Sequence, residues 1–466
     1  MDRPTTLGEL RASGYAPRTV KQEIRANLAS ALAEGRTPFP GIVGLDDTVL
    51  PLLESALLAG HDLVLLGERG QGKTRLMRTL VGLLDEVVPV VEGCEINDEP
   101  TQPVCGRCRR LHAELGDELP VAWWPREDRY IEKLATPDTS VGDLVGDVDP
   151  VKVAEGRTLG DPETVHYGLL PRTNRGIFGI NELPDLAERI QVAMFNVLEE
   201  RDIQVRGYSL RLPIDLLLVA SANPEDYTNR GRIITPLKDR FGAELRTHYP
   251  EEVAEEVTLI AQEARLVADV PVHLMEVIAR LVRGLRASPA VDQRSGVSAR
   301  FAIAAAEGVS ASALRRAART GEERAVARIG DVFTVLPMLL GKIEFESGEE
   351  GREVEVVAHL LRVAIAETFR ERLAGQDLTA FIELFAQGET IETGELVTAA
   401  ELLRQAGALP GLAAVLERLD GAGAADSEAE VGPGEAAAAV ELVLEGLHLT
   451  RRIDKSSVGG RSVYGA

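Results

Sequence analysis

A glycine-rich segment at residues 67–74, Gly-Glu-Arg-Gly-Gln-Gly-Lys-Thr, constrains this 466-residue chain more than any other feature. It follows an aliphatic run at 63–66 and leads into a stretch, 73–84, with helical spacing. A strand, a GxxxxGK[ST] loop and a helix in this order wrap backbone N–H groups around phosphates at a helix N-terminus. The flanking strand and helix disfavour the alternative, a plain turn that spells the motif by chance. We therefore predict binding of ATP or GTP.

Two side chains of this loop have predicted chemical roles. Lys73 supplies a mobile ammonium for the phosphates, and the hydroxyl of Thr74 is a ligand for magnesium. The predicted cofactors are thus ATP and magnesium. The residues predicted to bind the nucleotide here are Gly67, Gly70, Gln71, Gly72, Lys73, Thr74 and Arg75.

Charge and composition restrict the class of partner. The chain has 74 Asp plus Glu against 51 Lys plus Arg, a net charge of −23, and this acidity disfavours a dedicated nucleic-acid binder. Residues 1–13 lack the apolar core of a signal peptide, and the longest apolar runs fall far short of the ~20 residues of a membrane helix. We expect a cytoplasmic protein with no membrane span.

The pattern of apolar residues predicts an α/β fold followed by helices. Short aliphatic runs at 63–66, 176–180 and 216–220 alternate with helical segments, which is typical of a parallel sheet with helices on both faces. We predict a helical N-terminal arm (1–36), an α/β nucleotide-binding domain (37–250), two helical regions (251–343 and 354–419), an acidic flexible linker (420–435), and a C-terminal helix with a loose basic tail (436–466).

Polar residues follow the second aliphatic strand, as Asn181 and Glu182. At this edge of the sheet, P-loop ATPases usually carry Asp-Glu, the first residue holding the magnesium shell and the second acting as the base for the attacking water. Glu182 fits the role of base, whereas Asn181 lacks the charge, so we expect weaker magnesium binding or hydrolysis. The alternative is that Asn181 caps the next helix.

The third strand ends in Asn223, whose amide is suited to orienting water near the γ-phosphate. Further on, Arg240 follows a short predicted helix and is a candidate finger that reaches a neighbouring subunit. Taken alone, Asn223 is equally compatible with a strand-end turn, and Arg240 with a solvated surface charge. The order of the motifs along the chain favours the functional interpretation.

All three cysteines lie in one segment, with His112 close behind in the spacing C-x10-C-x2-C-x3-H. Three interpretations stay open. Cys94, Cys105, Cys108 and His112 could hold a structural zinc ion. Cys105 and Cys108 could instead be a redox pair, and all three could be ordinary reduced cysteines.

Motif order and style resemble one branch of the AAA+ ATPases. The segments Ile42-Val43-Gly44, Gly168-Leu169-Leu170, Asn174-Arg175-Gly176, Ala222-Asn223-Pro224 and Asp239-Arg240-Phe241-Gly242 look like those of the magnesium-chelatase I-subunit and MoxR clade. The likeness covers residues 37–340 and implies an AAA+ sheet domain with a helical lid.

This resemblance assigns roles residue by residue. Ile42 and Val43 would flank the adenine, and Glu182 would be the catalytic base. Asn223 would be sensor 1, Arg240 the trans-acting finger and Arg300 sensor 2, with Arg294 a weaker candidate. The family's insertion and hairpin would correspond to 141–173 and 204–213.

By the same resemblance we expect an ATP-hydrolysing ring, a hexamer, that remodels or assembles a protein partner carrying a von Willebrand factor A-type domain. Two alternatives stay open. One is an authentic I subunit of a magnesium or other metal chelatase. The other is a σ54-type transcriptional activator, although residues 141–173 contain no GAFTGA-like loop.

Overall fold

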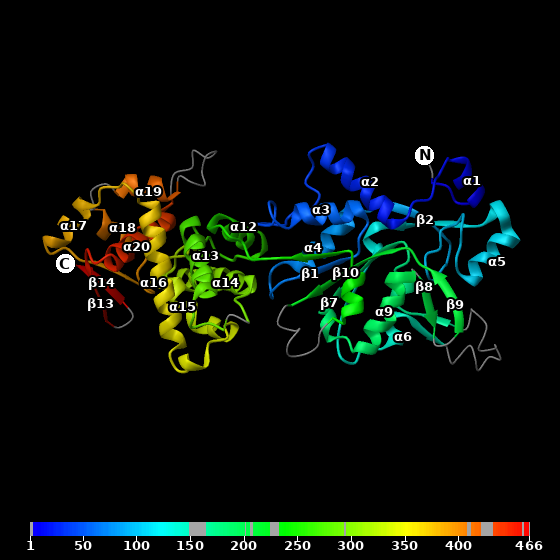
Figure 1. Cartoon of the computed structure of the whole chain (residues 1–466). Coiled ribbons are helices and arrows are strands. Elements are labelled where there is room, and N and C mark those ends of the chain that lie inside the picture. The colour runs from blue at the N-terminus through cyan, green and yellow to red at the C-terminus, as the bar shows by residue number, and fades with distance from the viewer. Residues whose placement is uncertain are drawn as a thin grey trace. The chain divides into compact units, whose positions relative to one another are not determined.

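The computed structural model describes residues 3–148, 165–200, 202–205, 208–223, 233–292, 295–407, 412–420, 432–458 and 461–465. They form two compact units, Met1–His248 and Tyr249–Ala466, and each is described by itself (Figure 1). Residues 149–164 of the predicted insertion, Arg294 and residues 421–431 of the predicted linker lie outside the described residues.

A five-stranded parallel sheet forms the centre of the first unit, in the order β11-β1-β10-β7-β4. The three strands predicted from aliphatic runs are confirmed as β1, β7 and β10, whereas β4 and β11, which contain charged residues, were not predicted. The strand bounds are β1 (Leu63–Leu66), β4 (Tyr130–Leu134), β7 (Gly176–Asn181), β10 (Leu216–Ala222) and β11 (Ala243–Arg246).

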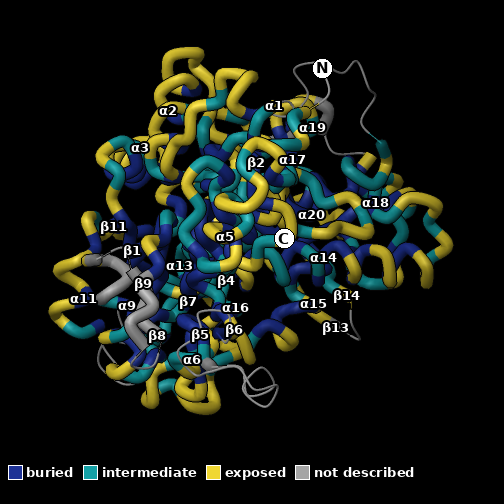
Figure 2. Tube along the Cα trace, turned by 90° about the vertical axis from the view of Figure 1, so that its right-hand side faces the viewer, coloured by how far each residue is buried: buried dark blue, intermediate teal, exposed yellow. Residues whose placement is uncertain are grey.

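Side chains of this sheet alternate between two cores, which confirms the prediction of helices on both faces. Leu63 and Leu65 pack into one core and Val64 and Leu66 into the other, as the two-residue period of a strand requires. The strands β1, β7 and β10 are buried along their whole length. Figure 2 labels β1 and β7 and colours buried residues dark blue. The first core includes residues of α2 (Val20–Ala33), α3 (Leu50–Ala59) and α4 (Lys73–Thr79), and the second includes residues of α9 (Glu188–Glu200) and α11 (Thr235–Arg240).

Smaller elements surround this sheet. The predicted hairpin at 204–213 is confirmed by the antiparallel pair β8 (Asp202–Val205) and β9 (Tyr208–Pro213). These elements are α1 (Leu7–Ala12), α5 (Gly106–Leu115), α6 (Val141–Leu144), α8 (Leu169–Arg172), and the antiparallel pairs β2 (Val87–Val91) with β3 (Val121–Pro125), β5 (Gly146–Val148) with β6 (Val165–Tyr167), and β8 (Asp202–Val205) with β9 (Tyr208–Pro213).

The second unit is mainly helical, with one continuous apolar core. Nothing within the described ranges of the chain is a helix long and apolar enough to cross a membrane. The helices of the second unit are α12 (Val253–Glu263), α13 (Val272–Ala287), α14 (Ala299–Thr320), α15 (Ile329–Leu339), α16 (Glu353–Arg372), α17 (Thr379–Ala386), α18 (Ala399–Ala406), α19 (Leu412–Asp420) and α20 (Pro433–Leu449).

The prediction of a loose basic tail was wrong. After α20 the chain forms β13 (Asp454–Val458) and β14 (Arg461–Gly465), and β14 pairs with β12 (Ile391–Gly394), a strand inside the region predicted as helical. The ammonium of Lys455, in the segment predicted as the tail, donates to a Glu445 carboxylate oxygen at 2.7 Å. Ile391 of β12 and Tyr464 of β14 are part of the apolar core of the second unit, so this small sheet packs against the helices.

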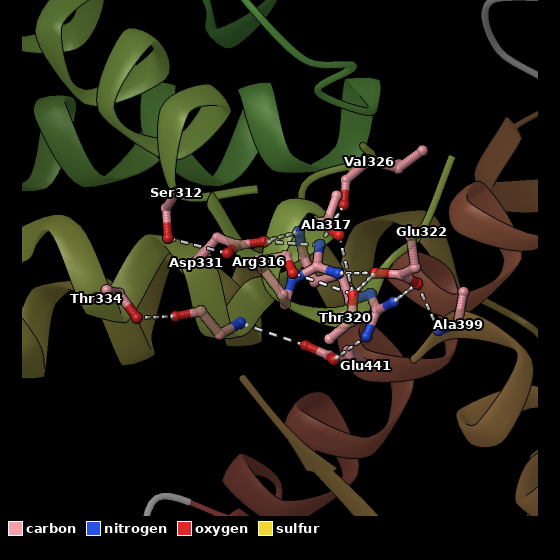
Figure 3. Close-up of polar contacts among 12 residues, drawn as sticks. Ser312, Arg316, Ala317, Thr320, Glu322, Val326, Asp331, Thr334, Ala399 and Glu441 are labelled. Atoms are coloured by element: carbon pink, nitrogen blue, oxygen red, sulfur yellow. Dashed lines mark hydrogen bonds and ion pairs between the residues drawn. The ribbon is translucent and has the colours of Figure 1, made fainter. Parts of the chain in front are cut away.

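Buried charges tie the helices of the second unit together (Figure 3). Arg316 of α14 contacts Glu322 at 2.9 Å and Asp331 of α15 at 3.1 Å. Arg328 contacts Glu322 at 2.8 Å and Glu441 of α20 at 3.7 Å. Because each buried arginine has two carboxylate partners, removal of one carboxylate would leave that arginine with a single partner.

Candidate nucleotide-binding site

Glycines give the loop between β1 and α4 its shape. A Cβ on Gly67 would lie 2.0 Å from the Thr247 hydroxyl oxygen and 2.3 Å from the Gln71 side-chain oxygen, so no larger residue fits. Gly70 and Gly72 have φ of 78° and 75°, in the left-handed region that favours glycine. The loop conformation thus requires the residue type that the sequence provides at these three positions.

Lys73 points into this loop. Its side chain is 7% exposed, and its ammonium donates to the carbonyl oxygens of Gly67 at 2.5 Å and Glu68 at 2.8 Å. It also donates to the amide oxygen of Asn223 at 2.8 Å, across 150 positions of the chain. The fold therefore brings the predicted phosphate-binding cation and the predicted sensor amide into direct contact.

Asn223 also contacts Glu182. The Asn223 amide nitrogen donates to the Glu182 carboxylate at 2.8 Å, so one amide links the predicted base to the predicted cation. Glu182 has φ 55° and ψ 47°, a left-handed conformation that is uncommon for a residue with a Cβ. Strained backbone of this kind is often found at functional sites.

Asn181 orients its side chain across the edge of the sheet. Its amide oxygen accepts hydrogen bonds from the hydroxyls of Thr74 at 3.1 Å and Ser221 at 3.0 Å. Its amide nitrogen donates to a carboxylate oxygen of Glu132 at 2.6 Å. The alternative that Asn181 caps a helix is wrong, because the next helical segment (Leu183–Asp185) begins after Glu182 and has no side-chain cap.

Glu132 is a residue of this site that the sequence did not point to. It lies on β4, the strand beside β7, and its side chain is 21% exposed. Arg78 donates to its two carboxylate oxygens at 2.8 and 3.1 Å, and the hydroxyl of Tyr130 donates at 3.2 Å. Burial, and then the Glu132 charge, raises the pKa of Tyr130, which keeps this hydroxyl protonated as a donor. No motif spacing links residue 132 to residue 181, since only the strand order makes them neighbours.

A pocket lies beside the P-loop, where the carboxyl ends of β1 and β11 meet. Of the two residues predicted to flank the adenine, Ile42 packs against the core on the α2–α4 face, and Val43 is half-buried. Arg75 is in the first turn of α4. The pocket is lined by Leu66, Gly67, Glu68, Gln71, Lys238, Arg246 and Thr247.

The two other predicted arginines lie at helix ends. Arg240 ends α11, where its guanidinium forms an ion pair with Glu199 and lies 4.6 Å from the centre of the Phe195 ring. Arg300 belongs to the second unit, in the first turn of α14, and its backbone N–H donates to the hydroxyl of Ser298 at 3.2 Å. Both residues are exposed.

The cysteine cluster has a different fourth member from the predicted one. The ligand atoms of Cys94, Asp98, Cys105 and Cys108 all lie within 4.8 Å of one another. His112 is not in this group, and its Nε2 is buried without a hydrogen-bond partner. The spacing suggested His112 because it follows Cys108 by one helical turn, but the loop before α5 folds Asp98 against the thiols instead.

Part of the chain is similar in sequence to subunits of magnesium chelatase. The chain is 29% identical over 245 residues to the magnesium-chelatase subunit ChlI of Nostoc sp., covering 51% of this chain and 61% of that protein. It is 30% identical over 246 residues to the magnesium-chelatase 38 kDa subunit of Rhodobacter capsulatus, covering 51% and 64%. About half of the chain is thus similar to these magnesium-chelatase subunits. Its expected AAA+ fold, a P-loop sheet domain followed by a helical region, is confirmed.

The sequence similarity extends over only part of the length of these relatives. The chain spans between 52% and 64% of the length of these relatives and of the chloroplastic ChlI-2 of Arabidopsis thaliana. No family model matches the chain. Among solved structures, a model of the complex between subunits BchI and BchD of magnesium chelatase aligns with 68% of this chain and 98% of that chain, at 23% identity and a TM-score of 0.36.

Proposed function

We propose that this protein hydrolyses ATP with magnesium and uses the cycle as a ring-forming AAA+ motor of the magnesium-chelatase-like MoxR type. The observation that carries the proposal is the direct line of contacts from Lys73 through Asn223 to Glu182. It joins a phosphate-binding cation, a polar amide and a carboxylate at one edge of the sheet. The homology to magnesium-chelatase I subunits supports the same activity.

Phosphate binding would be the task of the loop and Lys73. The ammonium is held on two loop carbonyls and one amide oxygen, so it is already oriented toward the mouth of the loop. An incoming phosphate would replace some of these neutral oxygens with charged ones, and charge-assisted hydrogen bonds are about twice as strong as neutral ones. The backbone N–H groups at the start of α4 add their partial positive charge.

Glu182 would activate the attacking water. A carboxylate within hydrogen-bonding reach of water accepts its proton as it attacks the γ-phosphate. Asn223 would hold this carboxylate in place through its amide nitrogen while its amide oxygen contacts Lys73. The left-handed backbone of Glu182 turns its side chain away from the strand direction of β7 and toward β10.

Thr74, Asn181 and Glu132 fit a magnesium ion. Thr74 and Asn181 present a hydroxyl and an amide oxygen, and Glu132 behind them presents a carboxylate, which are the hard oxygen donors that this cation prefers. When bound, magnesium neutralises charge that develops on the phosphate oxygens. Thr74 would contact the ion, and Asn181 and Glu132 would orient its shell.

Assembly and partners complete this proposal. Arg240 is exposed at the end of α11, and a finger role in a hexameric ring would have it reach the ATP of a neighbouring subunit. The substrate of the motor would be a protein partner with a von Willebrand factor A-type domain. A second candidate function, an authentic I subunit of a metal chelatase, is favoured by the roughly 30% identity to such subunits.

Phosphate release with magnesium and ATP tests the proposed activity. Lys73→Ala should abolish both nucleotide binding and hydrolysis, whereas Glu182→Gln should retain binding of a fluorescent ATP analogue and lose hydrolysis at least tenfold. Hydrolysis by Glu182→Gln at the parental rate would rule out the proposed base. Lack of hydrolysis by the parental chain, with and without a porphyrin and a candidate partner, would rule out the function.

A further inference from the structure

We propose that Cys94, Asp98, Cys105 and Cys108 form a structural zinc site in the first unit. The three thiol sulfurs and a carboxylate oxygen lie within 4.8 Å of one another. Cys105, Cys108 and Asp98 are buried, and Cys94 is half-buried. Four protein ligands around one point make a closed site, which is typical of structural and not catalytic zinc. This inference does not depend on ATP hydrolysis.

Local structure brings the two halves of the cluster together. Cys94 follows β2 in a turn, in which its N–H donates to the carbonyl of Val91 at 3.1 Å. Cys105 is the N-cap of α5 and Cys108 lies in the first turn, so the two sulfurs meet on the same side of the helix start. The left-handed Asn97, with φ 53°, folds the chain back so that Asp98 approaches the same point.

Asp98 is the residue that distinguishes a metal site from a group of packed thiols. Its side chain is fully buried, and one carboxylate oxygen accepts from the N–H groups of Val104 at 3.1 Å and Cys105 at 2.9 Å. The other oxygen, Oδ1, is buried without a partner. A buried carboxylate oxygen without a partner is costly, and a cation bound by the neighbouring sulfurs would supply that partner.

Backbone N–H groups also donate hydrogen bonds to two of the cysteine sulfurs. The N–H of Asp98 donates to Cys94 Sγ at 3.4 Å, and the N–H of Cys108 donates to Cys105 Sγ at 3.2 Å. Such donors stabilise the negative charge of metal-bound thiolates, and donors behind ligand atoms commonly orient them. The two hydrogen bonds to Asp98 Oδ2 fix the direction of its free oxygen.

The donor set favours zinc over other ions. Three of the four ligands are soft thiolates, which do not suit magnesium or calcium, and zinc binds both thiolate sulfur and carboxylate oxygen. Donor atoms about 2.3 Å from a tetrahedral centre are about 3.8 Å apart, so the observed cluster needs only a small contraction. Iron–sulfur clusters usually require four cysteines, and the described residues offer three here.

Zinc at this point would stabilise the loop that supports the strand of the nucleotide site. The loop residue Asn97 donates to the carbonyl of Arg172, and Asn174 donates to the carbonyl of Ile96 at 3.0 Å. Residues 172–174 lie just before β7, which ends in Asn181. The metal would therefore fix the segment that leads into this strand.

The metal content of the full chain tests the site. After incubation with zinc and gel filtration, elemental analysis should find about one zinc per chain, and cobalt(II) should give the visible absorption of a tetrahedral thiolate site. Thermal unfolding of the parental chain should shift upward with zinc, a measurement that needs no variant. Absence of bound zinc from the parental chain, or a Cys105–Cys108 disulfide in its place, would overturn the proposal.

Two variants separate the structural ligand set from the one predicted by spacing. Asp98→Asn should weaken zinc binding by at least tenfold, whereas His112→Ala, the matched control on the same helix as Cys108, should leave the stoichiometry unchanged. Cys108→Ser should lose the ion. The reverse pattern, with loss in His112→Ala and none in Asp98→Asn, would overturn the assignment of Asp98.

Discussion

The amide nitrogen of Asn181 donates to the carboxylate of Glu132 at 2.6 Å, across two neighbouring parallel strands. The negative charge that an aspartate would provide at position 181 is therefore present one side chain further from Thr74. Asn181 transmits this charge by hydrogen bonding, because its oxygen faces the Thr74 hydroxyl and its nitrogen faces Glu132. The first carboxylate of the usual pair has, in effect, moved to an adjacent strand.

The first prediction concerns Asn181→Asp. Two carboxylates would then face each other where an amide and a carboxylate now form a hydrogen bond, and we expect the chain without magnesium to lose about 1 to 3 kcal/mol of stability. Magnesium would relieve this repulsion. The variant should therefore reach half-maximal ATP hydrolysis at a lower magnesium concentration than the parental chain, as a magnesium titration at fixed ATP would measure.

A charge swap provides the control. In the double variant Glu132→Gln, Asn181→Asp the amide and the carboxylate exchange places, so thermal stability without magnesium should recover toward the parental value. Glu132→Gln alone should raise the magnesium requirement. If the double variant were as unstable as Asn181→Asp, like-charge repulsion would not be the cause.

The second prediction concerns the amide that links Lys73 and Glu182. Asn223→Ala removes both hydrogen bonds, and we expect at least a tenfold loss in the rate of hydrolysis with little change in nucleotide affinity, because neither the loop nor the cation is altered. Asn27→Ala, which removes a part-buried amide elsewhere in the first unit, is the matched control. If Asn223→Ala lowered the affinity for ATP but reached the parental rate at saturating ATP, the residue would act in binding alone.

The third prediction concerns Arg240. If it acts on the ATP of a neighbouring subunit, mixing Arg240→Ala with Lys73→Ala should restore part of the activity that each variant lacks. Each kind of subunit supplies the group that the other has lost. Additive, unrestored activities in a mixture shown by light scattering to form rings would exclude a role in trans.

Glu199 is expected to modulate this finger. Its ion pair with Arg240 is about one-third exposed on both sides, and such pairs contribute about 0.2–1 kcal/mol. Release of the arginine by Glu199→Gln should therefore raise hydrolysis at limiting protein concentration by no more than about fivefold. A fall in activity would show instead that Glu199 positions Arg240 for its task.

Local sequence was sufficient where burial or backbone shape imposes a pattern. The strands β1, β7 and β10 are buried on both faces, so each contains an aliphatic run that could be predicted. The conformation of the loop could be predicted from Gly67, Gly70 and Gly72, because positive φ or close approach at these positions excludes other residues. These features depend on residues close to one another along the chain.

Features that depend on sheet order or loop path could not be predicted. Glu132 lies on a charged strand that gives no aliphatic signal, and it meets Asn181 only because β4 pairs with β7. Asp98 replaces His112 in the cysteine cluster because of a left-handed turn at Asn97. Tyr464 lies in the segment predicted as a loose tail, but it is buried against Glu445.

The last prediction concerns acid stability and His273 on α13. Burial, and then the charge of Arg372, lowers the pKa of His273 to about 3, whereas an unfolded histidine titrates near its ordinary value of about 6.5. Between these values the unfolded state binds a proton that the folded state does not, so stability falls as pH decreases from about 6.5 to about 3. The slope from this residue is about 1.4 kcal/mol per pH unit where the two states differ by one proton. His273→Leu, of similar volume, should flatten the pH dependence of the unfolding midpoint in this window.

The buried Glu441, whose pKa is raised by burial, acts in the opposite direction but is common to both proteins, so the difference between their curves isolates His273. Parallel curves for the two proteins between pH 4 and pH 6.5 would mean that His273 is not the group whose protonation destabilises the fold.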